Sequence, residues 1–313
     1  MFRYRVGVVV PTYRSAAVVG GAIASISAQT YADWTTVVVD DGSPDAASVE
    51  AVLRGVDRVH YLPMPHRGAA ATRNSGIEFL DVDLIAFLDA DDEWLPDYLE
   101  RQVACLEAHP EWSAVYSDAY LVRDDEVLDA LYSDQNPSRG PVTFESLVSG
   151  ACNPITSGTL VRRQALTDVG GFDPSLVRAH DFDLWVRLVR RGHVIGYELV
   201  PLVRYRVSSS GLSGDSLSVL ERDCTILRHV AGYPDLTDTE RRAVGAALAE
   251  SESRLELAIG KKALAASDYA AGRCAFARAW RHRPTVKTAA VCTLAHLAPR
   301  VLRFLAARRI GTR

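Results

Sequence analysis

The amino-terminal part of the chain alternates apolar runs of strand length with segments of helical periodicity. The runs at residues 4–11 and 34–43 are rich in β-branched residues and end in turn residues, which is typical of β-strands. Apolar residues between them recur with helical spacing and share one face: Val19, Ile23 and Ile26. Because Ser15 is placed to cap this helix, the segment predicts a β-α-β unit.

The same alternation continues further along the chain. It predicts a strand at residues 58–63, a helix at about residues 68–79 and another strand at residues 84–89. Four strands that alternate with helices indicate a parallel, doubly wound sheet, so the first half of the chain is α/β. Ligands of such sheets bind beyond the carboxyl ends of the strands. Three of those ends read "PTYR", "DDGS" and "DADD".

The "DADD" strand end has a high density of carboxylates. Asp89, Asp91, Asp92 and Glu93 lie together, just before a helix that is expected to begin near Pro96. One acid there is ordinary helix-capping chemistry, but four repel one another unless a cation or cationic ligand binds. Mg²⁺ and Mn²⁺ take one or two protein carboxylates and complete their shells with water and phosphate oxygens. The cluster therefore predicts a metal-bound diphosphate.

Four blocks of sequence between residues 5 and 213 resemble glycosyltransferase family two, the inverting nucleotide-sugar transferases with the GT-A fold. The blocks are "VVVPTYRSAAVVGGAIASISAQTYADWTTVVVDDGSPD", "HRGAAATRNSGIEFLDVDLIAFLDADDEWLPDYL", "GGFDPSL" and "AHDFDLWVRL". A lone D-x-D motif is common by chance, whereas four blocks in order at predicted strand ends and helices are specific. The resemblance implies an α/β, GT-A (Rossmann-like) fold with a mixed, mostly parallel sheet flanked by helices and followed by a C-terminal helical region.

The resemblance also implies a nucleotide pocket at the first strand ends and on the 68–79 helix. Its residues are Pro11, Thr12, Tyr13, Asp41, Arg73 and Asp89. Tyr13 offers a ring on which a base stacks, and Asp41 offers an acceptor for a pyrimidine imide N–H. Ordinary turn chemistry at both strand ends and a solvated helix charge at Arg73 are the alternatives. Asn74 is implied to face the donor, and His66 stands where Asn is usual.

Within "DADD", the resemblance makes Asp91 the ligand of Mn²⁺ or Mg²⁺. It makes Asp89 a partner for the ribose or, through water, for the metal. The ion neutralises the charge that accumulates on the leaving diphosphate. Asp92 and Glu93 are left as candidate caps of the following helix.

An inverting transfer needs a base that deprotonates the acceptor hydroxyl. The family motif implies Asp181 for this role, with Asp183 at the helix start or near the acceptor. His180 replaces the usual Glu, which leaves the orientation of donor or acceptor open. Trp185 is expected to face a sugar or to lie in the core. The alternative for both aspartates is electrostatic stabilisation of a helix amino end.

Residues 203–215 resemble the mobile loop that closes over the donor in this family. Arg206 is then expected to reach the diphosphate, and the following Ser/Gly-rich tract permits movement. Ser208 stands where the family often has His. A flexible linker is the alternative.

The chain is predicted to divide into a GT-A domain at residues 1–213 and a helical region at residues 214–313. Within the second, residues 260–284 resemble a tetratricopeptide half-repeat, with small residues at packing positions. An amphipathic pattern at residues 297–309 suits an anionic membrane surface, the protein's own domain or a second subunit.

Charge is distributed unevenly between the two regions. From Ser251 onward there are 13 Lys and Arg against three acids, a net charge of +10, which leaves 22 against 36, or −14, upstream. The basic residues lack interleaved stacking aromatics, so nucleic acid is not an expected partner. No apolar run reaches the length of a membrane span, and the five scattered cysteines predict neither a disulfide framework nor a zinc site. We expect a cytoplasmic protein, with contact at the inner face of the plasma membrane as an option.

Together these patterns predict an inverting, metal-dependent glycosyltransferase that moves a sugar from a nucleotide-diphosphate sugar to an acceptor hydroxyl. UDP is the expected nucleotide, with dTDP and GDP as alternatives. The acceptor is a glycan, a lipid-linked or a small molecule in bacterial surface polysaccharide, glycoconjugate or natural-product assembly.

Two other functions are alternatives to this one. A sugar-nucleotide pyrophosphorylase would need a Gly-rich basic loop after the first strand, which "VVVPTYRSA" lacks. A non-catalytic nucleotide-sugar-binding scaffold of a glycan-assembly complex is the alternative that the departures at His180 and Ser208 suggest.

Overall fold

The computed structural model describes residues 4–207 and 216–298. The chain divides into two compact units, Met1–Ser208 and Ser209–Arg313. The boundary predicted after residue 213 lies outside the described residues, as does Ser208.

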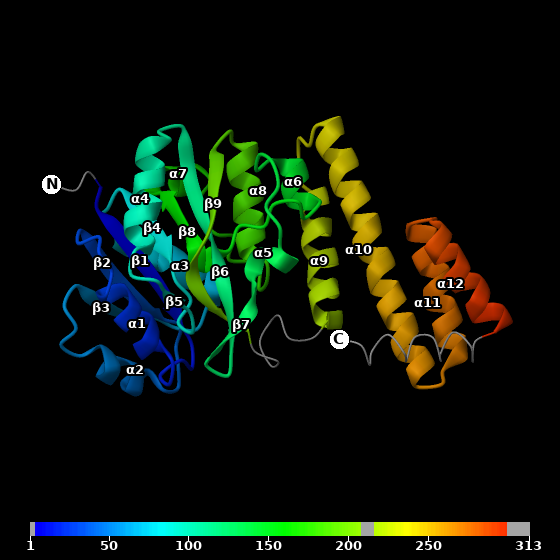
Figure 1. Ribbon diagram of the computed structural model, residues 1–313, viewed down its shortest axis with the longest axis horizontal. Helices are drawn as coiled ribbons and strands as arrows, with labels where there is room; N and C mark the ends of the chain where they lie inside the picture. Colours follow the sequence, from blue (N-terminus) through cyan, green and yellow to red (C-terminus); the bar gives the residue numbers. More distant parts are fainter. Residues whose placement is uncertain (1–3, 208–215, 299–313) are drawn as a thin grey trace. The chain divides into compact units, whose positions relative to one another are not determined.

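The first unit contains a nine-stranded sheet in the order β3-β2-β1-β4-β8-β6-β9-β5, with β7 paired to β6 (Figure 1). The strands are β1 (Val6–Thr12), β2 (Trp34–Asp40), β3 (Val59–Pro63), β4 (Leu84–Phe87), β5 (Glu93–Trp94), β6 (Trp112–Arg123), β7 (Glu126–Leu131), β8 (Thr159–Arg162) and β9 (Val194–Arg206). Strands β1 to β4 are parallel, and so is the β6–β9 pair. Strands β5, β7 and β8 run antiparallel to their partners, so the sheet is mixed, as predicted.

Helices cover both faces of the parallel strands. The helical segments are α1 (Val19–Ser27), α2 (Ala46–Leu53), α3 (Ala69–Phe79), α4 (Tyr98–Ala108), α5 (Tyr132–Gln135), α6 (Phe144–Val148), the 3₁₀ turn η1 (Thr156–Gly158), α7 (Arg163–Asp168) and α8 (His180–Arg190). Val8 and Val10 share a core cluster with residues of α1 and α4. On the other face, α3 lies so close that a Cβ on Gly76 would be 2.5 Å from Val9 Cγ1. Burial on both faces explains the near-continuous apolar runs of these strands.

The structure confirms the helix predicted between the first two strands but not its cap. Val19, Ile23 and Ile26 are buried in α1. Val18 is the residue before the helix, and the Ser15 hydroxyl donates to the carbonyl of Tyr13 at 3.1 Å. The Ser15 carbonyl instead accepts from the backbone N–H of Val19 at 2.9 Å.

The second unit consists of α9 (Ser216–Ala231), α10 (Asp238–Ala265), α11 (Tyr269–His282) and α12 (Val286–Leu297) within the described residues. The hairpin predicted at residues 260–284 corresponds to the end of α10 and to α11. Gly260 permits their close packing, because a Cβ there would be 2.4 Å from the Phe276 ring. The amphipathic segment predicted at residues 297–309 lies outside the described residues from position 299 onward. No described helix is long and apolar enough to cross a membrane.

Candidate active site

The carboxyl ends of β1, β2 and β4 lie side by side, as the sequence predicts. Thr12 is opposite Asp40 in the parallel ladder, and the Asp41 N–H donates to the Thr12 carbonyl at 2.9 Å. On the other side of β1, the Leu88 N–H donates to the Val9 carbonyl at 3.1 Å. Pro11, Tyr13 and Asp89 therefore belong to one edge of the sheet.

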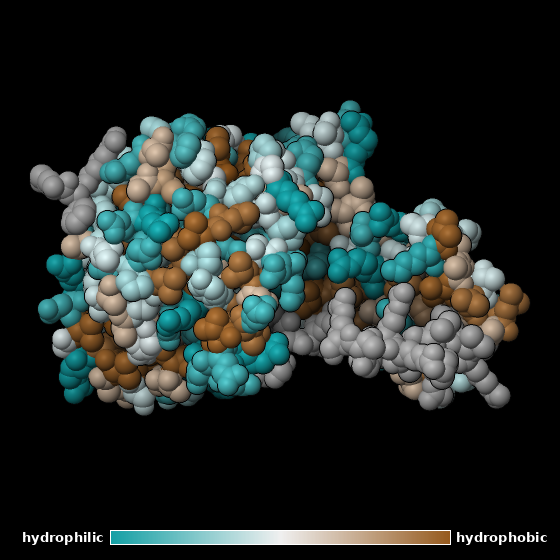
Figure 2. Space-filling view, in the orientation of Figure 1, coloured by the Kyte–Doolittle hydropathy of each residue, from teal (hydrophilic) through white to brown (hydrophobic). Residues whose placement is uncertain are grey.

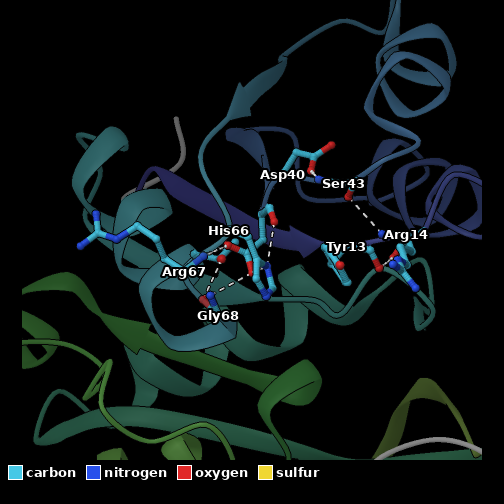
Figure 3. Close-up of polar contacts among 10 residues, drawn as sticks. Tyr13, Arg14, Asp40, Ser43, His66, Arg67 and Gly68 are labelled. Carbon is cyan, nitrogen blue, oxygen red and sulfur yellow. Dashed lines mark hydrogen bonds and ion pairs between the residues drawn. The ribbon is translucent and has the colours of Figure 1, made fainter.

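At the β1 end, the Tyr13 ring lies between a histidine and an arginine (Figure 3). The centroid of the Tyr13 ring is 4.7 Å from that of the His66 ring. The guanidinium carbon of Arg14 is 5.2 Å from the same Tyr13 centroid. The Tyr13 side chain is 42% exposed, so part of it is available to a planar ligand.

Asp41 shapes the loop that leads into α3. Its two carboxylate oxygens accept from the backbone N–H groups of Arg67 at 2.7 Å and Gly68 at 3.0 Å. His66 Nδ1 lies 2.8 Å from the same carboxylate (Figure 3). Each carboxylate oxygen has further lone-pair capacity, so a nucleobase N–H is compatible with these bonds.

Arg73, on α3, connects the predicted metal-binding turn with the start of the helix that carries the predicted base. Arg73 is only 5% exposed. Its guanidinium pairs with Asp89 and donates to His180 Nε2 at 2.7 Å. The alternative, that Arg73 is a solvated charge on the helix surface, is therefore wrong. Because His180 accepts this bond through Nε2, its neutral form carries the proton on Nδ1.

The 3₁₀ turn η1 makes a second connection between the "DADD" turn and Asp181. The Thr156 hydroxyl donates to the Asp181 carboxylate at 3.0 Å. The adjacent Ser157 hydroxyl donates to Asp92 at 2.5 Å and accepts from the Asp89 N–H at 3.2 Å. Two neighbouring hydroxyls thus hold the "DADD" turn and Asp181 in one framework.

Burial, followed by repulsion from neighbouring acids, raises the pKa values of two carboxyl groups in the "DADD" turn, Asp91 and Asp92. Asp91 reaches solvent. Desolvation by the surrounding protein, and next the charge of Asp89, nevertheless raise the pKa of its carboxyl group. Asp92 is 1% exposed, and burial followed by repulsion from Asp89 and Asp91 raises its pKa well above the usual value. A cation at Asp91 and Asp89 would relieve this repulsion, so the donor set fits Mn²⁺ or Mg²⁺ with a diphosphate completing the shell. No cluster of three potential protein ligands was found among the described residues.

Arg206 lies on β9, not in a loop, and contacts the same turn. Its Nε donates to the Asp91 carbonyl at 3.2 Å, its backbone N–H donates to Asp92 at 2.8 Å, and its guanidinium pairs with Asp125 at 2.7 Å. A cavity of about 320 Å³ adjoins these groups. It is lined by Asp91, Glu93, Val122, Asp125, Val127, Arg204 and Arg206.

Asp181 is half-buried near the start of α8 and is kept ionised. Burial raises its pKa, but His180, the Phe182 N–H, Arg73 and the Thr156 hydroxyl outweigh burial and lower it. Burial, and next Arg73, lowers the pKa of His180, so this imidazole is neutral at neutral pH. At that pH the stabilisation of Asp181 therefore comes from the hydrogen bonds and Arg73 rather than from an imidazolium.

Three of the candidate donor or acceptor residues have structural roles instead. The Asn74 amide both donates to and accepts from the backbone of Phe172 at 2.8 Å, which fixes the "GGFDPSL" loop. Asp183 is 1% exposed and pairs with Arg187 at 2.7 Å. Trp185 is also 1% exposed and belongs to the core, so the sugar-facing alternative is wrong.

Asp92 and Glu93 do not cap the next helix. Glu93 is in β5, while Asp97 is the residue that precedes α4. The sequence reasoning also missed Thr156, Ser157 and Tyr205. Small hydroxyl residues in "NPITSGTL" follow no motif that would have marked them. Tyr205 lies on β9 near the acids, since burial and then Asp92 raise its pKa.

We expect the neutral His180 to make stability depend on pH. Its folded-state pKa lies below the unfolded value of 6.5, so the unfolded chain takes up the proton more readily. This contribution is present above about pH 6.5 and declines as the pH falls, by at most about 1.4 kcal/mol per pH unit. In urea titrations at about pH 7.5 and about pH 5.5, His180→Gln should lose less stability than the parent. Equal losses in both proteins would contradict the assignment.

Known glycosyltransferases resemble this chain in sequence. It is 25% identical over 226 residues to the UDP-Glc:alpha-D-GlcNAc-diphosphoundecaprenol beta-1,3-glucosyltransferase WfgD of Escherichia coli, covering 72% of this chain and 85% of that protein. It is 26% identical over 212 residues to the amylovoran biosynthesis glycosyltransferase AmsB of Erwinia amylovora, covering 64% and 69%.

Solved structures share the fold. TarS residues 1–349 of S. aureus, in complex with UDP-GlcNAc, match with a TM-score of 0.62 at 16% identity over 97% of this chain and 89% of that one. The mannosyltransferase PcManGT from Pyrobaculum calidifontis, in complex with GDP-Man and Mn²⁺, matches with a TM-score of 0.62 at 20% identity over 98% and 85%. These neighbours identify the fold as GT-A. The model of Glycosyl transferase family 2 matches residues 7–170, more than half of the chain. The protein is therefore a glycosyltransferase and belongs to this family.

Proposed function

We propose that the protein is an inverting, divalent-metal-dependent glycosyltransferase that transfers a sugar from a nucleoside-diphosphate sugar to an acceptor hydroxyl. Asp181 is the general base, and the nucleotide lies against the ends of β1 and β2. The observation that carries the proposal is the double connection between the "DADD" turn and Asp181. One connection passes through Arg73 and His180, and the other through Thr156 and Ser157.

The connection matters because inversion requires the base and the leaving group on opposite sides of the sugar. Arg73 and η1 are buried supports that hold both groups at a fixed separation, which lowers the entropic cost of alignment. Asp181 accepts the acceptor's proton as its hydroxyl oxygen attacks the anomeric carbon. Ionisation of Asp181 at neutral pH, which its lowered pKa supports, is a condition for this step.

At the other end, the site's own cations and hydrogen-bond donors face the leaving diphosphate. A divalent ion, when bound by Asp91 with Asp89, supplies Lewis-acid stabilisation of the charge on the diphosphate. Arg206 is already at the Asp91 carbonyl and is exchanged from Asp125 onto a phosphate oxygen when the donor binds. Tyr13 stacks on the base, and Asp41 accepts from it.

The relatives support a UDP-sugar donor and an acceptor in bacterial polysaccharide assembly. WfgD is named for UDP-Glc and a diphosphoundecaprenol acceptor, AmsB for amylovoran biosynthesis, and TarS binds UDP-GlcNAc. We therefore rank UDP first, dTDP and GDP next, and a lipid-linked glycan before a small-molecule acceptor.

The test is a thermal-shift screen with UDP, dTDP, GDP and CMP, each with and without Mn²⁺. We expect one nucleoside diphosphate to raise the melting temperature clearly only when Mn²⁺ is present, because Asp91 would hold the ion and the ion would offset the charge of the diphosphate. An equal shift for every nucleotide, independent of Mn²⁺, would contradict the proposal. A non-catalytic scaffold would give the same shift but release no sugar in the subsequent product assay.

A further inference from the structure

Helix α12 in the second unit is apolar on both of its faces. Its inner face packs on the core formed by Leu264, Phe276 and Ala295, together with Val291, Cys292 and Leu294. Its outer face is exposed and has the spacing of one helical stripe: Val286, Ala290, Thr293 and Leu297. Val286 is 89% exposed and Leu297 is 80% exposed. Apolar surface accordingly lies over α12 in Figure 2. A helix that has an exposed apolar stripe in addition to its buried one normally has a second surface against it.

The surroundings of this outer face are basic. From Tyr269 to the end, the chain contains ten Lys and Arg and no Asp or Glu. Arg278 and Arg283 pair with acids of α10. Arg281 and Lys287, which flank the α11–α12 connection, are exposed and have no carboxylate partner among the described residues. Trp280, at the end of α11, is 47% exposed.

We propose that the outer face of α12 and the α11–α12 connection bind the surface of an anionic phospholipid bilayer. The exposed valine and leucine enter the boundary between headgroups and acyl chains, while Lys287 and Arg281 reach lipid phosphates. Trp280, which is exposed near the α11–α12 connection, suits the same boundary, because its ring is apolar and its N–H is polar. At 12 residues α12 is too short to span the bilayer, so it lies on the surface.

Charge favours the bilayer over the other surfaces that could cover α12. A second copy would bring the same exposed cations, Arg281 and Lys287, against those of this one, and the like charges would repel. The chain's own end, residues 299–313, adds five arginines and no acid, so it would also increase the positive charge there. An anionic bilayer accepts both the apolar stripe and the cations. Each cation near the surface increases the affinity for the bilayer about fivefold.

Vesicle flotation of the full-length chain tests the proposal without donor, acceptor or metal, so its outcome is independent of the proposed function. We expect the protein to float with vesicles of phosphatidylglycerol and phosphatidylcholine, to float poorly with phosphatidylcholine alone, and to be released by salt. Val286→Glu should weaken binding by at least about tenfold, since it removes a buried apolar group and adds a repelled charge. The double variant Arg281→Ala and Lys287→Ala should weaken it by about 25-fold.

Val177→Glu is the matched control, because Val177 is 88% exposed and lies in the first unit. It should bind vesicles as the parent does. The proposal is overturned if Val286→Glu and Val177→Glu float equally, or if the parent does not float with anionic vesicles. It is also overturned if sedimentation shows a dimer that Val286→Glu dissociates, since a second copy would then cover α12.

Discussion

Replacing Asp181 by Asn is expected to lower turnover by about 10²-fold or more while leaving donor affinity nearly unchanged. The amide keeps the size of the carboxylate. Its oxygen can still accept from the Phe182 N–H, and its NH₂ group can donate to the Thr156 hydroxyl oxygen, which reverses the direction of that bond. It cannot take the acceptor's proton. Asn also serves at a helix amino end about as well as Asp, so α8 should remain intact. Initial rates at saturating donor, with donor affinity from calorimetry, measure the effect.

Asp183→Asn is the matched control on the same helix. Because Asp183 is buried and paired with Arg187, we expect a loss of stability and a smaller loss of turnover. An Asp181→Asn enzyme that turns over at the parental rate while Asp183→Asn is inactive would move the base to Asp183. Parental rates in both variants would reopen the scaffold hypothesis.

Replacing Asp91 by Ala is expected to abolish Mn²⁺-dependent binding of the nucleoside diphosphate. A fall of roughly 10²-fold or more is expected, because loss of a supporting residue around a metal ligand alone costs 10- to 100-fold. The fold should not suffer, since Asp91 is exposed and its removal relieves repulsion on Asp92. Calorimetric titration of the nucleotide with and without Mn²⁺ measures the change.

The control is Asp57→Ala, which removes an exposed acid before β3, away from the strand ends that form the site. It should bind as the parent does. Unchanged Mn²⁺-dependent affinity in Asp91→Ala would show that Asp91 is not the metal ligand. A lower melting temperature in Asp91→Ala would contradict the account of its electrostatics.

The parallel part of the fold could be predicted because burial on both faces leaves a strong signal. The runs that became β1, β2 and β4 are almost entirely β-branched or apolar, and polar residues follow at once. Strand β9 lacks this signal. Its carboxyl half mixes buried, half-buried and exposed residues without alternation and contains Arg204 and Arg206, so "VRYRV" does not stand out as a strand.

The site could be predicted only as far as motifs mark it. Asp89, Arg73 and Asp181 are predicted because they stand in recognisable blocks, and the structure brings them together. A motif does not say whether a polar side chain faces the ligand or the backbone, and Asn74 serves the backbone. The sequence does not mark Thr156 and Ser157, because no motif surrounds them. Their hydroxyl groups contact Asp181 and Asp92 only after folding brings these distant acids to them.

The most direct test of the central claim is the anomeric form of the sugar first released by slow hydrolysis of the donor, which needs no acceptor. Proton NMR, recorded before mutarotation, follows the reaction of the screened α-linked nucleotide sugar with Mn²⁺. The account predicts that the β-anomer appears first, with loss of the signal in Asp181→Asn and after removal of Mn²⁺ by a chelator. Release of the α-anomer first, or release unaffected by both changes, would contradict it.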